Sequence, residues 1–388
     1  MSRNSYIDAL RGLSIVLVVV LHVQIRVRLQ DTFLFRHVSD ILWAFWCRNG
    51  HNGVRIFFVI SGFLITSTSL ARWGSLQHID ARRFYQLRFA RIAPPLLLLL
   101  ALLSLLHLLG VTNYTIDPAK ATLWRALFSA LTLHLNWLEA QVGYLPAAWD
   151  VLWSLSVEEA FYLFFPFACL ALRRAAGRVA VLTLLALLII IAPIFRALEQ
   201  NPIWNMKAYL ACFDAIAIGC LAAAWLHQRT LPLRTRATFA IIGGALVLAV
   251  LALERRPLFV PLNAHGLTET ILALGVAALL VAAARAQVPQ RTARWLRPLT
   301  ACGRLSYEIY LTHIFVVFAA LSVFKGNDLP IDAAPVMVAI VLAVSWALAA
   351  LVERYISAPS NRWLRGAVAP ATEQPRAGTA EPGTRGAE

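Results

Sequence analysis

Long uninterrupted apolar blocks constrain the fold of this chain more than any other feature of its sequence. A bilayer core needs about 20 consecutive apolar residues for each spanning helix. Hydrophobic residues make up 60% of the chain and charged residues 14%, whereas an ordinary soluble domain carries roughly 25% charged residues. The clearest blocks are residues 96–110, 179–194, 239–253, 271–284 and 335–351. The sequence therefore predicts an all-α, multi-pass integral membrane protein embedded in a lipid bilayer.

The spacing of the blocks predicts about ten transmembrane helices. Two arginines, Arg26 and Arg28, follow the first block, and no small-residue cleavage site is present. We therefore expect the first block to stay in the protein as a helix and not to be removed as a signal peptide. The predicted spans lie near residues 10–25, 54–71, 93–110, 149–171, 179–195, 206–226, 237–253, 267–284, 302–323 and 335–352.

Arginine is concentrated in alternate connections between these spans. If the N-terminus lies inside the cell, 23 of the 35 Lys and Arg residues fall in the inner segments. Inner loops carry such an excess of positive charge in membrane proteins, so we expect both termini to face the cytoplasm. A net charge of +15 on a soluble protein would suggest nucleic acid as a partner. Here it marks topology, and we expect no nucleic-acid partner.

The remaining segments carry little chemistry of their own. Residues 111–148 form the longest outer connection, and residues 123–138 within it have the apolar spacing of a helix lying at the membrane surface. Residues 366–388 lack apolar periodicity and are predicted to form a disordered cytoplasmic tail. The five cysteines show no CxxC spacing, so neither a disulfide framework nor a metal site is indicated.

Polar side chains inside five of the predicted spans are more informative. An ionised side chain at a helix centre costs roughly 2.5–3.5 kcal/mol on insertion scales, so such groups require a partner or a function. We expect the five side chains to lie at a similar depth in the membrane and to face one another around a water-filled cavity. Asp214 is also expected to pair with an arginine. The five residues are His22, Ser61, Glu158, Asp214 and His313.

Arg11 and His22 stand eleven residues apart on the first predicted helix. Eleven steps of about 100° return to nearly the same helix face, and a rise of about 1.5 Å per residue separates the two side chains by roughly 16 Å. We expect Arg11 at the cytoplasmic mouth of the bundle and His22 above it, near the middle of the membrane.

Four arginines, Arg82, Arg83, Arg88 and Arg91, lie in the predicted loop between the second and third spans. Their placement is also what membrane topology alone would produce. Alternatively, some of them act with Arg11 as a clamp for phosphate groups, because the planar guanidinium fork binds phosphate well.

Five motifs, in order, resemble the integral-membrane acyltransferase 3 family. The resemblance covers roughly residues 5–355, so that residues 1–355 are expected to form one membrane acyltransferase domain. The motifs are Asp8–Gly12 (DALRG) with a helix ending in His22, Phe57–Ile65 (FFVISGFLI), Phe84 and Tyr85 through Arg88, Arg91 and Pro94, Trp153–Tyr162 (WSLSVEEAFY), and Gly303–Tyr307 (GRLSY) with Tyr310–His313 (YLTH).

This resemblance implies a function that the residue pattern alone does not specify. Members of the family transfer acetyl or a related acyl group from cytoplasmic acyl-coenzyme A to a hydroxyl, usually on a sugar of a cell-surface glycan. It also implies a bacterial cytoplasmic (inner) membrane, with acyl-coenzyme A as co-substrate and no tightly bound cofactor. Some relatives carry a hydrolase-like domain after the helices. We expect any relay that needs such a domain to use a separate protein here.

His22 is the expected catalytic residue. As a base it would deprotonate the acceptor hydroxyl during attack on the thioester, since imidazole titrates near neutral pH. An acyl-histidine intermediate is the alternative route. Without the family match, a lone histidine in a membrane helix would more simply be a hydrogen-bonding residue between helices.

The other expected site residues surround His22. Arg11 belongs to the catalytic set as a ligand for a coenzyme A phosphate, and Arg83, Arg88 and Arg91 would bind the same donor. Glu158 would orient His22 or an arginine, bind acceptor hydroxyls, or form only a buried ion pair. Residues expected to line the substrate cavity are Ser61, Trp153, Tyr307 and His313, although Ser61 and Gly62 would also suit close helix packing.

A secondary transporter of a small polar solute is the main rival function, because charged groups in the membrane are also typical of transporters. The sequence shows no inverted repeat and no matching pair of Gly/Pro-broken helices, both of which are common in such proteins. The enzyme is therefore the favoured interpretation.

Overall fold

The computed structural model describes residues 4–284 and 294–366, and in these ranges the chain is helical without any strand. Within them, nine helices are long and apolar enough to cross a membrane. A tenth span is obtained if the pair Pro257–Ala264 and Thr268–Ala283, bent by 99°, is counted as one. The predicted all-α membrane fold is confirmed. The predicted disordered tail lies outside the described residues from position 367 onward.

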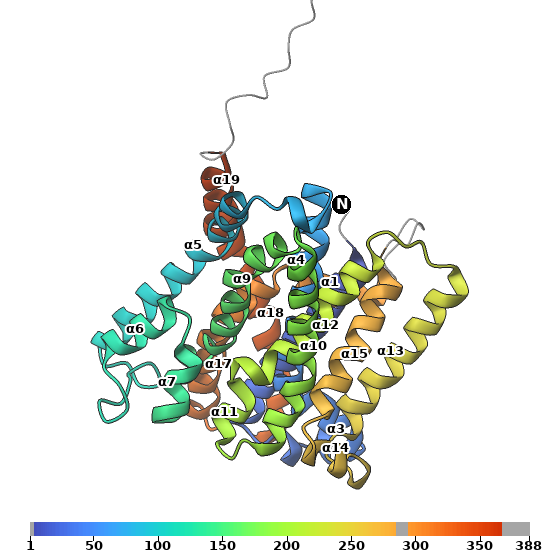
Figure 1. Cartoon of the computed structure of the whole chain (residues 1–388). Coiled ribbons are helices and arrows are strands. Elements are labelled where there is room, and N and C mark those ends of the chain that lie inside the picture. The colour runs from blue at the N-terminus through green and yellow to red at the C-terminus, as the bar shows by residue number, and fades with distance from the viewer. Residues whose placement is uncertain (1–3, 285–293, 367–388) are drawn as a thin grey trace, which may run out of the picture.

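The long helices are joined by short helical segments (Figure 1). The long ones are α1 (Ser5–Gln24), α4 (Gly50–Trp73), α5 (Ala81–Leu108), α9 (Trp153–Ala171), α10 (Ala175–Leu198), α12 (Tyr209–Leu226), α13 (Leu233–Leu253), α15 (Thr268–Ala283), α17 (Ser306–Gly326) and α18 (Ala334–Val352). The shorter ones are α2 (Phe33–Arg36), α3 (Asp40–Cys47), α6 (Leu123–Leu131), α7 (Leu135–Val142), α8 (Ala147–Asp150), α11 (Pro202–Lys207), α14 (Val260–Ala264), α16 (Arg297–Arg304) and α19 (Ala358–Gly366).

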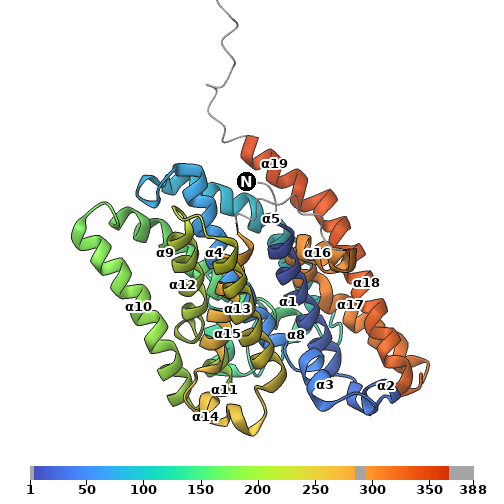
Figure 2. The ribbon, with the colours of Figure 1, turned by 90° about the vertical axis from the view of Figure 1, so that its right-hand side faces the viewer.

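Helices α1, α4 and α12 form the interior of the bundle. Helices α10 and α18 lie on its two sides in Figure 2, and α13 lies at its edge in Figure 1. In the most apolar window of α4, 67% of the residues are buried, against 11% in that of α10. An apolar helix with so little protein contact is suited to face lipid. The start of α1, the start of α5 and α19 lie at one end of the bundle, and α3 and α14 lie at the other (Figure 1).

The basic cluster, which was predicted to lie in a loop, is part of a helix. Helix α5 begins at Ala81, twelve residues before the predicted start of the third span, so Arg82, Arg83, Arg88 and Arg91 are helical. Asp80 caps this helix by accepting a hydrogen bond from the backbone N–H of Arg83 at 3.0 Å, and Ala and Arg are good helix formers. The arginines therefore share the fixed directions of a helix instead of a flexible loop.

Other boundaries also differ from the prediction. The ninth span is broken at Leu305 into α16 and α17, and the tenth continues through the π-helical turn Glu353–Ser357 into α19. The predicted surface helix at residues 123–138 is two helices, α6 and α7. Leu133, between them, has a positive φ of 64°, which an α-helix does not accommodate.

The break after α16 lets two helices approach through glycines. A Cβ atom added at Gly303 would lie 1.7 Å from the carbonyl oxygen of Asp8, and one at Gly12 would lie 1.9 Å from that of Leu299. Only glycine permits such contact between the backbones of α1 and α16. Gly62 packs in the same way against the carbonyl of Ile216 in α12, which confirms the close packing considered at Gly62.

We expect Gly303→Ala to destabilise the protein by about 1–3 kcal/mol or more, because the added methyl group meets backbone that cannot turn aside. The thermal midpoint of the purified protein in detergent measures this. Gly244→Ala on α13 is the matched control, since nothing lies within 4 Å of a Cβ at that position. Equal midpoints for both variants would contradict the packing described for α1 and α16.

Candidate active site

Five helices, α1, α4, α5, α9 and α17, enclose a pocket of about 180 Å³. The pocket contains three arginines and two glutamates among otherwise apolar and aromatic side chains. Its polar and aromatic lining comprises Arg11, Phe57, Phe58, Ser61, Thr68, Arg88, Arg91, Ser154, Glu158, Glu159, Tyr162, Ser306, Tyr307 and Tyr310. Few convergent polar groups in an apolar cavity are typical of a ligand site.

Arg88 is the centre of this pocket. Its Nη2 atom lies 3.7 Å from Glu158 Oε1 and 3.8 Å from Glu159 Oε1. The guanidinium also stacks on Tyr162, with Cζ 3.6 Å from the ring centroid. Arg88 was expected to bind the donor, and the structure adds that its charge is shared with two carboxylates on α9.

Glu158 is held by three neighbours at a single oxygen. Ser61 Oγ of α4 and the Tyr162 hydroxyl each donate a hydrogen bond of 2.7 Å to its Oε1, in addition to the contact with Arg88. Glu158 and Tyr162 share one face of α9 because they are four residues apart. Of the roles considered for Glu158, the structure brings it to an arginine and not to His22.

Two polar atoms in this pocket have no hydrogen-bond partner. They are Nε of Arg88 and Oγ of Ser306, and both are buried. Buried polar atoms are almost always hydrogen-bonded in folded proteins. Two such atoms without a partner in the same cavity therefore indicate a place that a polar ligand or water fills.

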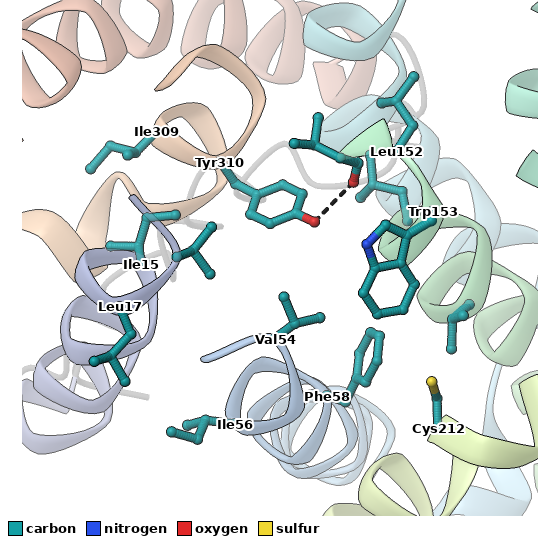
Figure 3. Packing of buried hydrophobic residues seen from close by; sticks show 14 of the residues in the cluster. Ile15, Leu17, Val54, Ile56, Phe58, Leu152, Trp153, Cys212, Ile309 and Tyr310 are labelled. Atoms are coloured by element: carbon teal, nitrogen blue, oxygen red, sulfur yellow. Dashed lines mark hydrogen bonds between the residues drawn. The ribbon is translucent and has the colours of Figure 1, made fainter. Parts of the chain in front are cut away.

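Tyr310 marks the inner end of the pocket. Its hydroxyl donates to the carbonyl oxygen of Val151 at 2.8 Å and accepts from Ser154 Oγ at 2.7 Å. Figure 3 shows the ring reaching from α17 toward Leu152 and Trp153, where α1, α4 and α9 converge. The ring centroid of Tyr310 lies 6.0 Å from that of His313, so the histidines begin where the pocket ends.

His22 and His313 form a pair just beyond Tyr310. Their ring centroids are 4.9 Å apart, and Nε2 of His313 lies 3.3 Å from Nδ1 of His22. His313 is completely buried and His22 is partly buried. His22 lies in the last turn of α1, which ends at Gln24, in agreement with the predicted span of residues 10–25. Neither ring is among the residues that line the pocket.

The expected donor-binding arginines divide into two groups. Arg11 and Arg91 line the pocket with Arg88, whereas Arg83 does not. Arg365 of α19 instead lies close enough to be repelled by three other arginines, which are Arg72, Arg83 and Arg91. A cluster of arginines thus lies beside the pocket, at the end of the bundle where α19 meets α5.

Two further expectations need correction. Trp153 does not line the pocket but packs on Phe58, with ring centroids 6.1 Å apart. Asp214 pairs with Arg196 at 3.0 Å, as predicted, but this pair is completely separate from the histidines and the pocket, bonding also to Thr270. The prediction that five polar groups meet in one cavity is therefore wrong: they fall into three clusters, because helix rotation and not depth alone determines which side chains meet.

Sequence analysis also missed a buried ion cluster beside Trp153. Lys207 Nζ lies 2.6 Å from Glu139 Oε2 and also contacts Asp150. The ammonium group lies 5.5 Å from the Trp153 ring centroid. Lys207 stands at the start of a predicted span, where a lysine usually reaches water. Its complete burial therefore could not be predicted from its position in the chain.

We expect Lys207→Met to destabilise the protein by about 3–5 kcal/mol, because it leaves two carboxylates near one another without a cation. The yield of monodisperse protein and its thermal midpoint measure this. Lys325→Met, at the exposed end of α17, is the control. An unchanged midpoint for Lys207→Met would show that the cluster contributes little to folding.

Within residues 4–284 and 294–366, no group of three or more His, Cys, Asp or Glu side chains is placed to hold a metal ion. The pocket and the adjacent histidine pair present imidazole, guanidinium, carboxylate and hydroxyl groups. Together they can bind anions, transfer protons and offer a nucleophilic nitrogen.

Curated proteins similar to this chain include two O-acetyltransferases. Peptidoglycan O-acetyltransferase OatA of Listeria monocytogenes is 24% identical over 370 residues, which are 92% of this chain and 55% of the relative. O-acetyltransferase OatA of Staphylococcus aureus is 25% identical over 306 residues, 74% of this chain and 49% of the relative. The chain thus spans about half the length of these relatives.

A third relative is covered more completely. BcsY of Komagataeibacter xylinus, which its name gives as a membrane-bound transacylase, is 28% identical over 330 residues, 80% of this chain and 72% of the relative. No solved structure matches the chain. Residues 4–350 match the family model described as an acyltransferase domain. The chain is therefore a multi-pass integral membrane protein that belongs to this acyltransferase family, the acyltransferase 3 family that its motifs resemble.

Proposed function

We propose that this protein is an O-acyltransferase that moves an acetyl group from acyl-coenzyme A at the cytoplasmic face of a bacterial inner membrane to a hydroxyl of a sugar or cell-surface glycan. One observation carries the proposal: a pocket with three arginines and two unpartnered polar atoms ends at Tyr310, directly beside a histidine pair. Both termini are cytoplasmic in this proposal, which puts the arginine-rich end of α5 on the side of the donor.

In this proposal, Arg11, Arg88 and Arg91 bind phosphate groups of coenzyme A. Guanidinium groups make bidentate, charge-assisted hydrogen bonds to phosphate, and those of Arg11 and Arg91 belong to two facing helices. Arg83 adds positive charge outside the pocket, where Arg72 and Arg365 also lie. The acyl-bearing arm then runs along Ser61 and Tyr307 toward Tyr310, which has to shift for the thioester to reach His22.

His22 performs the chemical step. Its imidazole accepts the proton of the acceptor hydroxyl while the oxygen attacks the thioester carbonyl. The carbon–sulfur bond then breaks, and the thiolate of coenzyme A leaves and takes up a proton. In the alternative route, the imidazole nitrogen itself attacks and passes the acyl group to the hydroxyl in a second step. Both routes need an unprotonated ring nitrogen on His22.

The relatives support an oxygen acceptor on a glycan, since two of them are named for O-acetyl transfer and one of these for peptidoglycan. None of the three named relatives is a transporter, which favours the enzyme over the rival function. A solute transporter would have no use for a site that binds acyl-coenzyme A.

Mass spectrometry of surface glycans from cells with and without the gene tests the proposed function. We expect the deletion strain to lack an acyl mass, and membrane vesicles supplied with isotope-labelled acetyl-coenzyme A to place the label in the same glycan. Unchanged glycans in the deletion strain, together with no transfer of label, would contradict the proposal.

Arg91→Gln should raise the KM for acyl-coenzyme A about 10- to 100-fold with little change in kcat, because a hydrogen bond to a charged group contributes about 1.5–3 kcal/mol. Initial rates over a range of donor concentrations in membrane vesicles measure this. Arg82→Gln is the matched control, since Arg82 is an exposed arginine of the same helix outside the pocket. Equal KM values for the two variants would remove Arg91 from the donor site.

A further inference from the structure

The hydrogen bonds of His313 fix the position of its ring proton. Nδ1 of His313 lies 3.1 Å from the carbonyl oxygen of Ile309 and 2.9 Å from that of Tyr310. A carbonyl oxygen only accepts, so Nδ1 must carry the proton. In the neutral ring, Nε2 of His313 then has a free lone pair, and this is the atom that faces His22.

The same reasoning applies to His22. Its Nδ1 lies 2.9 Å from the carbonyl oxygen of Val18 and 3.3 Å from Nε2 of His313. Both neighbours are acceptors, so Nδ1 of His22 carries the proton and donates to the two of them. The lone pair of neutral His22 therefore resides on Nε2, to which no described residue makes a hydrogen bond.

We propose that His313 is a positioning residue: as the second acceptor beside the carbonyl of Val18, it holds the ring of His22 with its proton on Nδ1 and with a bare Nε2, the nitrogen that takes the acceptor proton or attacks the thioester. This inference rests on the proposed function for its chemistry, but the tautomer itself does not depend on any substrate. The carboxylate of a Ser-His-Asp triad fixes its histidine in the same way. Here the orienting group is a second imidazole, itself oriented by backbone carbonyls.

Two cations act on the pair. Arg26 and Lys207 act on His22, and Arg26 also acts on His313. Both oppose a positive charge on the ring of His22, and a neutral partner offsets this less than a carboxylate would. When Nε2 of His22 takes a proton, the Nδ1–H of the imidazolium still donates to His313 and to Val18, so part of the new charge is spread over these two acceptors.

Two substitutions of His313 separate positioning from simple packing. Glutamine can reproduce both contacts, because its amide NH₂ donates to the carbonyls while its oxygen accepts from His22. Phenylalanine fills a similar volume but offers no acceptor. We expect His313→Gln to keep most of kcat and His313→Phe to lose about 10- to 100-fold in kcat, with the KM for acyl-coenzyme A unchanged in both. Leucine replaces phenylalanine if that variant does not fold.

Solid-state NMR of protein labelled with ¹⁵N-histidine gives a readout besides activity. We expect the unprotonated nitrogen of His22 to be Nε2 in every variant, because the carbonyl of Val18 still accepts from Nδ1. The ¹⁵N shift of Nδ1 should be retained in His313→Gln and should move in His313→Phe or His313→Leu, which remove the second acceptor. An identical Nδ1 shift in all variants, or equal kcat losses for Gln and Phe, would overturn the inference. If the wild type transfers no acyl group, the proposed function is refuted instead. The NMR result does not depend on acyl transfer and still tests the role of His313.

Discussion

Replacing His22 with alanine is expected to reduce acyl transfer by at least about 10²- to 10⁴-fold, the range that a positioned general base contributes. The loss should appear in kcat, because Arg11 and the rest of the donor pocket are unchanged. Transfer of labelled acetyl from acetyl-coenzyme A to the glycan fraction of membrane vesicles measures it. Should the acyl-histidine route operate, the loss is larger still, since the nucleophile is then missing.

His265→Ala provides the matched control for His22→Ala. The Nδ1 atom of His265 lies 2.7 Å from the carbonyl oxygen of Pro261, four residues earlier, which repeats the local contact between His22 and Val18. His265 is exposed and lies outside the pocket. The control should transfer acetyl normally. Normal transfer by a correctly inserted His22→Ala variant would remove His22 from the mechanism.

Arg88→Met is the second substitution with a large expected effect. It leaves Glu158 and Glu159 beside one another without their cation. Breaking a fully buried ion pair in this way costs about 3–5 kcal/mol, and we expect a smaller loss for these partly buried side chains. The variant should also lose nearly all transfer, since Arg88 contributes one of the three guanidinium groups of the pocket. The thermal midpoint and the rate of labelled acetyl transfer are measured on the same preparation.

A triple variant distinguishes the two consequences. When Glu158→Gln and Glu159→Gln are added to Arg88→Met, no unpaired charge remains in the cluster, so stability should largely return. Transfer should not return, because no guanidinium has been restored. If activity recovers together with stability, Arg88 has a structural role only and the donor site lies elsewhere.

The sequence contained enough information for the spans and for one side of the site. Apolar blocks of bilayer length directly predict membrane helices such as α4 and α10, because a helix in lipid makes all of its backbone hydrogen bonds within itself. Helical periodicity put Arg11 and His22 on one face of α1, but only Arg11 lines the pocket. Boundaries were less accurate where polar residues continue a helix, as the arginines at the start of α5 do.

Contacts between distant helices could not be predicted in the same way. His22 and His313 are 291 residues apart, and their meeting depends on the break at Leu305 and on the glycine contact of α16 with α1. The rotation of α9 about its axis brings Glu158 to Arg88 and turns Trp153 away from the pocket. Residue spacing along one helix does not determine how that helix is rotated relative to its neighbours. Tyr310 lay within a family motif, but nothing in the sequence indicated that it closes the pocket.

A structure of the protein bound to a non-hydrolysable thioether analogue of acetyl-coenzyme A tests the central claim most directly. We expect the phosphates to contact Arg11, Arg88 or Arg91, Tyr310 to be displaced, and the acyl carbon to lie about 3–3.5 Å from Nε2 of His22, as a reacting pair requires. An analogue bound outside this pocket, or bound within it with its acyl group pointing away from His22, would contradict the account.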